Sequence, residues 1–195
     1  NMSPNQIVNL VKAREAGCDF DFIEGFERDF WAFPLFADTL AFYSLPYWCT
    51  KNATEGFNGG IPSGYSNVGG LSPTTYPRLK NYTFQYTDVA LNDFIAKARD
   101  MVDLTYFKPP VTGVPDLGQI NSPSKAFYTT LSVRKKFADV ADSRNDNLGP
   151  DVATMDGRVM FRGGEIVWVP ALDADTTNPF YQIPWDVFKM MVKPG

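Results

Sequence analysis

A long helical pattern at the start of the chain constrains the fold more than any other feature. Apolar side chains recur every three or four residues and the run ends before Pro34. Ser3, Pro4 and Gln6 supply the cap, the first helical position and the capping-box residue. A helix over Ser3–Trp31 would be roughly 40 Å long, which indicates a spine rather than an ordinary helix of a small domain. The residues that follow this helical spacing are Ile7, Leu10, Val11, Arg14, Cys18, Phe22, Phe26 and Phe30, with Ile23 alongside.

Shorter patterns follow this helix, and glycine and proline, at 15 residues each, favour many turns between them. Strands and helices are mixed but do not alternate as βαβ units, so the predicted fold class is α+β. We expect strands at Tyr47–Thr50, Tyr82–Tyr86, Lys125–Leu131, Val159–Arg162, Ile166–Val169, Phe180–Ile183 and Asp186–Val192, further helices at Leu91–Phe107 and Ser132–Arg144, and a turn at Asn145–Gly149.

Composition excludes several classes of function. The 195 residues carry a net charge of -4 and no histidine, which removes the commonest general base and the commonest zinc ligand. The densest basic cluster is Arg134–Lys136, too small for a stand-alone nucleic-acid binder. No apolar run is long enough to span a membrane. Cys18 and Cys49 are expected to be buried, reduced thiols.

Two segments resemble ligand-binding loops only superficially. The glycine-rich stretch Gly56–Gly70 lacks the lysine and the spacing of phosphate-binding loops, so we expect a surface loop. Asp173–Asn178 resembles the start of a calcium loop but lacks its glycine and distant glutamate. Asp142–Asn147 most simply ends a helix and forms a turn. The sequence therefore predicts no metal site, no cofactor site and no catalytic constellation.

A carbohydrate-binding or glycoside-hydrolase-type protein stays open as an alternative. Such enzymes use paired carboxylates, and aromatic rings often stack on sugars. Nothing in the sequence selects one carboxylate pair over another. The candidate carboxylates are Asp19, Asp21, Glu24, Glu27 and Asp29, and the candidate aromatic residues are Trp48, Tyr65, Tyr76, Tyr82 and Tyr86.

The C-terminal third resembles the major capsid proteins of tailed bacteriophages with the Hong Kong 97 fold. The matching pieces of Asn145–Val192 are "NDNLG", "MDGRVMFR", "VWVPALD" and "NPFYQIPWDVFK". Upstream, "CTKNATEGFNGGIPSGY" (Cys49–Tyr65) and "SPTTYPRLKNYT" (Ser72–Thr83) fit the same family, and Asn5–Trp31 looks like its spine helix. The family has an N-terminal arm and an extended loop before that helix, which we expect this chain to lack.

The resemblance implies a structural role without catalysis. Residues 1–50 would form a peripheral domain with the spine helix (3–31), residues 51–178 mainly an axial domain, and residues 179–195 the returning strands of the peripheral domain. Partners would be other copies in pentamers and hexamers of an icosahedral shell that encloses double-stranded DNA without reading its sequence. Scaffold, portal or decoration proteins are further candidate partners. The virion, assembled in the host cytoplasm, would be the location. A cellular nanocompartment shell of the same fold is a second alternative.

On this interpretation, the glycine-containing stretch Ala153–Asp173 is a structural hairpin rather than a phosphate grip. Gly163 and Gly164 would form its turn. Phe161 and Trp168 would fill the core, so that Trp168→Ala would strongly destabilise the fold. Arg162 and Glu165 would be charges of the turn or of an interface.

Overall fold

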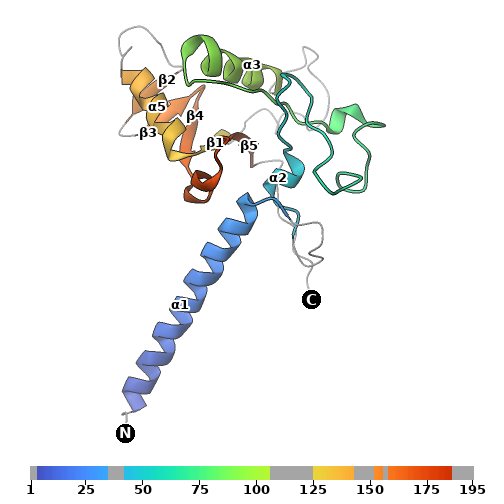
Figure 1. Cartoon of the computed structure of the whole chain (residues 1–195). Helices are drawn as coiled ribbons and strands as arrows, with labels where there is room; N and C mark the ends of the chain where they lie inside the picture. The colour runs from blue at the N-terminus through green and yellow to red at the C-terminus, as the bar shows by residue number, and fades with distance from the viewer. Residues whose placement is uncertain (1–3, 35–41, 106–124, 143–151, 156–157, 186–195) are drawn as a thin grey trace, which may run out of the picture. The chain divides into compact units, whose positions relative to one another are not determined.

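The computed structural model describes residues 4–34, 42–105, 125–142, 152–155 and 158–185 (Figure 1). The chain divides into two compact units. Unit 1 is formed by Asn1–Asn52 and Phe57–Asn81, and unit 2 by Ala53–Gly56 and Tyr82–Gly195. The expected division into 1–50, 51–178 and 179–195 concerns an assembled shell and stays a prediction.

Unit 1 contains the predicted long helix. Helix α1 (Pro4–Trp31) runs for 28 residues without interruption, which confirms the helix expected from the apolar periodicity. Two features stabilise the C-terminal end of α1. Trp31 is buried, and the hydroxyl of Ser44 donates a hydrogen bond to the carbonyl oxygen of Ala32 over 2.6 Å. The ring of Phe26 stacks on that of Phe42 at 5.2 Å between centroids.

The strand expected at Tyr47–Thr50 is wrong, because a short helix α2 (Leu45–Trp48) includes its first two residues and the other two form no strand. Proline in its first turn suits a helix start, and Leu45 and Tyr47 are buried. Unit 1 also contains the 3-10 helix η1 (Pro77–Leu79).

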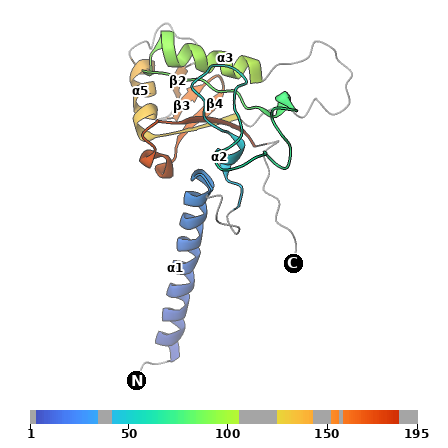
Figure 2. The ribbon, with the colours of Figure 1, turned by 45° about the vertical axis from the view of Figure 1, so that its right-hand side comes forward.

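Unit 2 is built on a five-stranded sheet with the strand order β2-β3-β4-β1-β5 (Figure 2). Strand β1 pairs in parallel with β4 and antiparallel with β5, while β3 pairs antiparallel with β2 and β4. The strands are β1 (Lys125–Thr129), β2 (Val152–Met155), β3 (Arg158–Phe161), β4 (Gly164–Trp168) and β5 (Phe180–Pro184).

Helices pack on this sheet through one aromatic core. Phe94 contacts Phe137 and Phe180 edge to face at 5.2 and 4.9 Å between ring centroids. Phe127 contacts Phe161 in the same way at 5.5 Å. The helical elements among the described residues of unit 2 are the π-turn η2 (Leu91–Ile95), α3 (Ala96–Thr105), α5 (Leu131–Asp142) and the 3-10 helix η4 (Pro170–Ala174).

The structure confirms the α+β class and most of the predicted elements of unit 2. The strand expected at Tyr82–Tyr86 is wrong, since Thr83 makes only an isolated bridge to Gly56. The strand expected to end at Leu131 ends at Thr129, and Leu131 begins α5. Strand β2 was not expected. The predictions for Asn145–Gly149 and Asp186–Val192 lie outside the described residues, as do the expected helix ends at Phe107 and Arg144.

Candidate functional site

The hairpin that joins β3 to β4 has a turn one residue earlier than predicted. Arg162 and Gly163 both have left-handed backbones, with φ of 48° and 79°, and Phe161 pairs with Gly164 across the turn. Two consecutive left-handed residues form the tight turn that matches the twist of a β-hairpin. Gly164 is therefore a buried residue of β4 and not part of the turn.

The guanidinium of Arg162 is engaged within the chain. Its two terminal nitrogens donate to the two carboxylate oxygens of Asp103 in α3, over 3.0 and 3.2 Å. Paired hydrogen bonds of this kind hold an arginine in a fixed orientation. The arginine beside the glycine turn thus ties the hairpin to a helix, and this geometry does not favour a phosphate site there.

The prediction that Trp168 fills the core is wrong, whereas the prediction for Phe161 is confirmed. Phe161 is fully buried, but Trp168 is 41% exposed. Trp168 is the last residue of β4, and its indole N–H donates to Oδ2 of Asp173 over 2.8 Å. The ring is held at the end of the sheet, beside η4, and the side chain that enters the core from β4 is Ile166.

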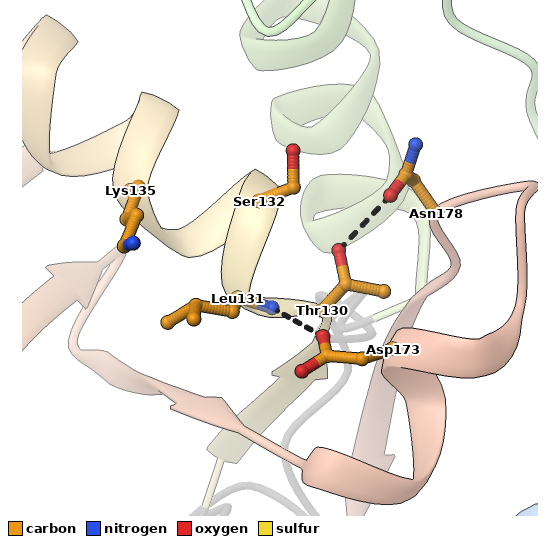
Figure 3. Close-up of a pocket in the computed structure, with 6 residues that line it drawn as sticks. All are labelled: Thr130, Leu131, Ser132, Lys135, Asp173 and Asn178. Atoms are coloured by element: carbon orange, nitrogen blue, oxygen red, sulfur yellow. Dashed lines mark hydrogen bonds between the residues drawn. The ribbon is translucent and has the colours of Figure 1, made fainter.

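The described part of unit 2 contains an open pocket of about 460 Å³ at the start of α5 (Figure 3). Asp173 accepts a hydrogen bond from the first amide of α5, Leu131 N, over 2.8 Å. The hydroxyl of Thr130 accepts one from Val133 N over 3.4 Å. Since these side chains already bind free amides of the helix end, the pocket offers an anion little. Its lining residues are Thr130, Leu131, Ser132, Lys135, Asp173 and Asn178.

We expect Asp173→Ala to lower the free energy of unfolding by about 1 kcal/mol, the usual cost of a lost helix cap. The substitution removes acceptors from Leu131 N and from the Trp168 indole. Asp173→Asn keeps one acceptor and should lose less. Urea denaturation of the three proteins measures the difference, and equal stability of Asp173→Ala and the parent would contradict the capping role.

The end of Asp173–Asn178, the segment whose sequence partly resembles a calcium loop, is a turn closed by its own side chains. Oδ1 of Asp175 accepts hydrogen bonds from the amide and the hydroxyl of Thr177, over 3.0 and 2.6 Å. The side-chain oxygen of Asn178 accepts a hydrogen bond from the hydroxyl of Thr130, and its main-chain oxygen accepts one from the hydroxyl of Tyr86. Burial raises the pKa of Tyr86 to about 12. No group of three metal-ligating side chains occurs among the described residues.

The glycine-rich stretch contributes to both units, and several of its amides are occupied. The amides of Gly56 and Gly59 donate to the carbonyls of Thr83 and Asn81 over 2.9 and 3.0 Å. Those of Gly60 and Gly69 donate to the hydroxyls of Thr50 and Tyr47 over 2.7 and 3.0 Å. A phosphate-binding loop needs amides that point at the ligand. This stretch uses these four amides for its own fold.

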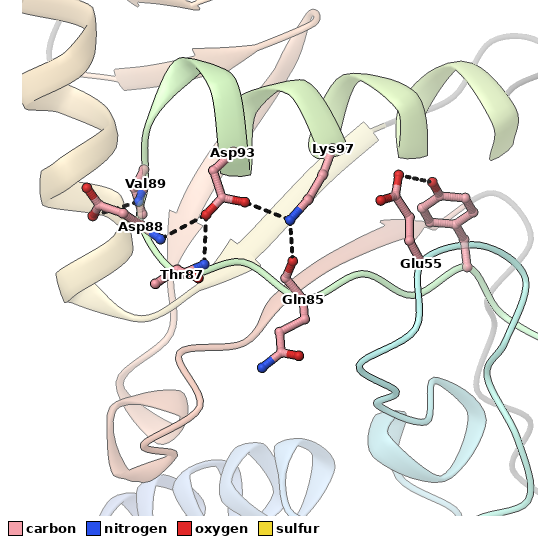
Figure 4. Close-up of polar contacts among 8 residues, drawn as sticks. Glu55, Gln85, Thr87, Asp88, Val89, Asp93 and Lys97 are labelled. Carbon is pink, nitrogen blue, oxygen red and sulfur yellow. Dashed lines mark hydrogen bonds and ion pairs between the residues drawn. The ribbon is translucent and has the colours of Figure 1, made fainter.

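A polar network stabilises the turn before α3 (Figure 4). Oδ2 of Asp93 accepts the amides of Thr87 and Asp88 over 2.8 and 3.0 Å, and Oδ1 accepts Nζ of Lys97 over 2.7 Å. Nζ of Lys97 also donates to the carbonyl of Gln85 over 2.7 Å. The hydrogen bond from Lys97, aided by the two amides, lowers the pKa of Asp93 to about 2.

This network predicts acid sensitivity. Because the folded-state pKa of Asp93 lies below its ordinary 3.8, its contribution is complete above about pH 4 and is lost as the pH falls toward 2. Asp93→Asn should therefore be less stable than the parent at pH 7 and lose less stability between pH 4 and 2. Denaturation midpoints against pH test this, and parallel profiles for both proteins would contradict it.

The residues expected for a sugar site are distributed over both units. Asp19, Asp21, Glu24, Glu27 and Asp29 are exposed on α1. Trp48, Tyr65 and Tyr76 belong to unit 1, and Tyr82 and Tyr86 to unit 2. The hydroxyl of Tyr82 donates to Glu55, and burial, followed by the Glu55 charge, raises the pKa of Tyr82. Asp173 is the single carboxylate that lines the pocket.

The two cysteines are free thiols in different surroundings. Cys18 is exposed on α1, which corrects the expectation that it is buried. Cys49 is partly covered, and burial raises the pKa of its thiol to about 11. Electrophilic reagents, which react with the thiolate, should therefore modify Cys49 slowly.

Exposed apolar surface is the feature of unit 1 that most requires an explanation. Along α1, Phe20 and Phe22 are each 74% exposed and Ile23 is 61% exposed. A second group surrounds buried Tyr47, whose ring lies 4.4 Å from that of Tyr43, 5.1 Å from that of Trp48 and 4.9 Å from that of Tyr65. Tyr43 and Trp48 are exposed. We call this group the aromatic cluster: Tyr43, Tyr47, Trp48 and Tyr65.

Sequence reasoning missed Tyr43 and the capping role of Asp173. Tyr43 precedes α2, so no helical spacing in the sequence relates it to Tyr47. The bond from Leu131 to Asp173 spans 42 residues and has no local signal.

Comparisons of the chain with protein-family models, with curated proteins and with solved structures give no match. Among the described residues, no helix is both long enough and apolar enough to cross a membrane.

Proposed function

We propose that the chain is a structural subunit of a self-assembling protein shell. Within this class, we propose a capsid subunit similar to the major capsid proteins of tailed bacteriophages, which encloses double-stranded DNA. The single observation that carries the proposal is the exposed apolar surface of α1, because large apolar side chains on a helix are typical of contacts with other proteins. The ordered sequence resemblance over nearly the whole chain selects the kind of assembly.

Further features of both units support a structural role. The aromatic cluster adds exposed Tyr43 and Trp48 to the apolar surface of unit 1, and aromatic residues are enriched in protein interfaces. In unit 2, Arg162 and Asp173 bind other parts of the chain. The net charge of -4 is compatible with a shell that encloses DNA without binding it sequence-specifically.

Electron microscopy and size-exclusion chromatography test the proposal directly. We would express this chain and, separately, the complete reading frame that encodes it. Capsomer rings or closed shells from either one are the expected result. Monomers alone from both, at high protein concentration, would overturn the proposal. Nucleic acid inside the shells would favour a capsid, and an enzyme cargo would favour a cellular nanocompartment of the same fold.

A further inference from the structure

The described residues of unit 1 leave most of α1 uncovered. Every described side chain from Leu10 to Glu24 is exposed, and no other described segment of unit 1 runs along this part of the helix (Figures 1 and 2). Helices in water gain most of their stability by burying an apolar face. Phe22 and Val11, at 74% and 48% exposure, lie on one face of this uncovered part of the helix.

One row of side chains along this face has a symmetric spacing. Val11, Arg14, Cys18, Phe22 and Gly25 follow one another at intervals of three, four, four and three residues, which places them on one side of a helix. Cys18 is the centre of the row and lies next to the midpoint of α1. Because the intervals are the same in both directions, each position of the row meets a position of the row on a second copy when the two helices run antiparallel.

The charges of α1 select the same orientation. The half from Pro4 to Gly17 contains Lys12, Arg14 and Glu15, a net charge of +1 from two positive and one negative side chain. The half from Cys18 to Trp31 contains five acidic side chains and Arg28, a net charge of -4. A parallel pair would bring the two acidic halves together, whereas an antiparallel pair brings each acidic half against a basic one. In an antiparallel pair the two helix dipoles also point in opposite directions, which is favourable.

We infer that two copies of this chain associate through antiparallel α1 helices, about a two-fold axis at Cys18. In this register Cys18 faces Cys18 of the second copy, and Arg14 faces Phe22 of the second copy, next to Asp21. Val11 faces Gly25 of the second copy, where the absence of a side chain leaves room for it. Each contact occurs twice, except the one on the axis.

The inference is drawn from α1 alone and does not rest on the proposed shell. Capsomer rings are built by head-to-tail contacts, whereas this contact is two-fold and self-complementary. Shells without the Cys18 contact would leave the proposed function intact and overturn the inference. The Cys18 contact without shells would support the inference and overturn the proposed function.

Disulfide trapping tests the axis. In a Cys49→Ala background, Cys18 is the single thiol, and diamide takes up the two electrons and two protons released when two thiols join. The matched control moves the thiol to the opposite face of the same turn, as Cys18→Ala with Ala16→Cys. We expect Cys18 to form covalent dimers at least tenfold faster than the control. Equal rates would overturn the inference.

A second pair of variants tests the orientation. With both natural cysteines replaced by alanine, a mixture of Val11→Cys and Gly25→Cys chains should form mixed dimers. Val11→Cys alone should not, because its two thiols would lie about 20 Å apart along the antiparallel pair. Position 25 has no atom within 4 Å of an added Cβ, so it accepts the cysteine. Dimers of Val11→Cys with itself would indicate a parallel pair and overturn the inference.

Charge-reversal variants test whether Arg14 lies next to Asp21 of the second copy. Arg14→Glu should slow Cys18 trapping several-fold by placing two acidic groups together, and Arg14→Glu combined with Asp21→Arg should restore it. Circular dichroism confirms that the helix persists in both variants. Failure of the double variant to recover would contradict the proposed register.

Discussion

Phe161→Ala should lower the free energy of unfolding by about 3–5 kcal/mol, the largest effect we expect from a single substitution. Phe161 is fully buried at the end of β3, and its ring lies 5.5 Å from that of Phe127 and 5.7 Å from that of Phe137. These contacts join β1 and α5 to the hairpin. Truncation to alanine removes the contacts and leaves a cavity that the close-packed core cannot fully close.

Trp168→Ala is the control for this prediction, because it removes a larger ring seven residues further along the hairpin. With 41% exposure and one hydrogen bond to Asp173, Trp168 should contribute less than about 1.5 kcal/mol. Urea denaturation of both variants, followed by far-ultraviolet circular dichroism, gives the comparison. If Trp168→Ala were as damaging as Phe161→Ala, the described register of β4 would be wrong.

Gly59→Ala should destabilise unit 1 by about 1–3 kcal/mol, the usual cost of overpacking. A Cβ at this buried position would lie 1.8 Å from Oδ1 and 2.9 Å from the main-chain oxygen of Asn81. That main-chain oxygen accepts the Gly59 amide, and the Asn81 side chain donates to the carbonyl of Thr50. The alanine would force apart hydrogen bonds that hold the glycine-rich stretch to its neighbours.

Gly60→Ala, one residue further on, is the matched control. An added Cβ there meets no atom within 4 Å, so its effect should stay within about 0.5 kcal/mol. Hydrogen exchange of peptides from residues 42–52 and 57–81 would measure the local stability in both variants. Equal acceleration of exchange would show that close packing at Gly59 is not the cause.

Local patterns predicted the helices better than the short strands. The stripe of α1 and the apolar positions of α5 are periodic over several turns, so their helices follow from the sequence. Aromatic residues at Tyr47 and Trp48 indicated a strand, but proline in the first turn and burial of Tyr47 favour a helix there. Propensity over four residues is too weak to resist such tertiary contacts.

For the candidate sites too, the sequence predicted what local patterns determine and missed what contacts between distant segments determine. The sequence predicted correctly that Phe161 is buried, because alternation along β3 places it on the inner face. It could not separate Trp168 from the core, because nothing in the local pattern shows that the sheet ends at that residue. Asp103, the partner of Arg162, lies in α3, and Leu131, whose amide Asp173 caps, lies in α5; both are far away in the sequence.

The position of β1 between β4 and β5 has a consequence for synthesis on the ribosome. Both neighbours of β1 are made later than β1 itself, and β5 brings Phe180 to the rings of Phe94 and Phe127. A nascent chain that ends before Phe180 therefore has a strand with an open edge and an unfinished cluster of phenylalanine rings. Such intermediates complete their non-local strand pairs slowly, and their exposed apolar surface is the kind that chaperones bind. Cooperative closure of unit 2 must wait until Phe180–Pro184 leaves the ribosome.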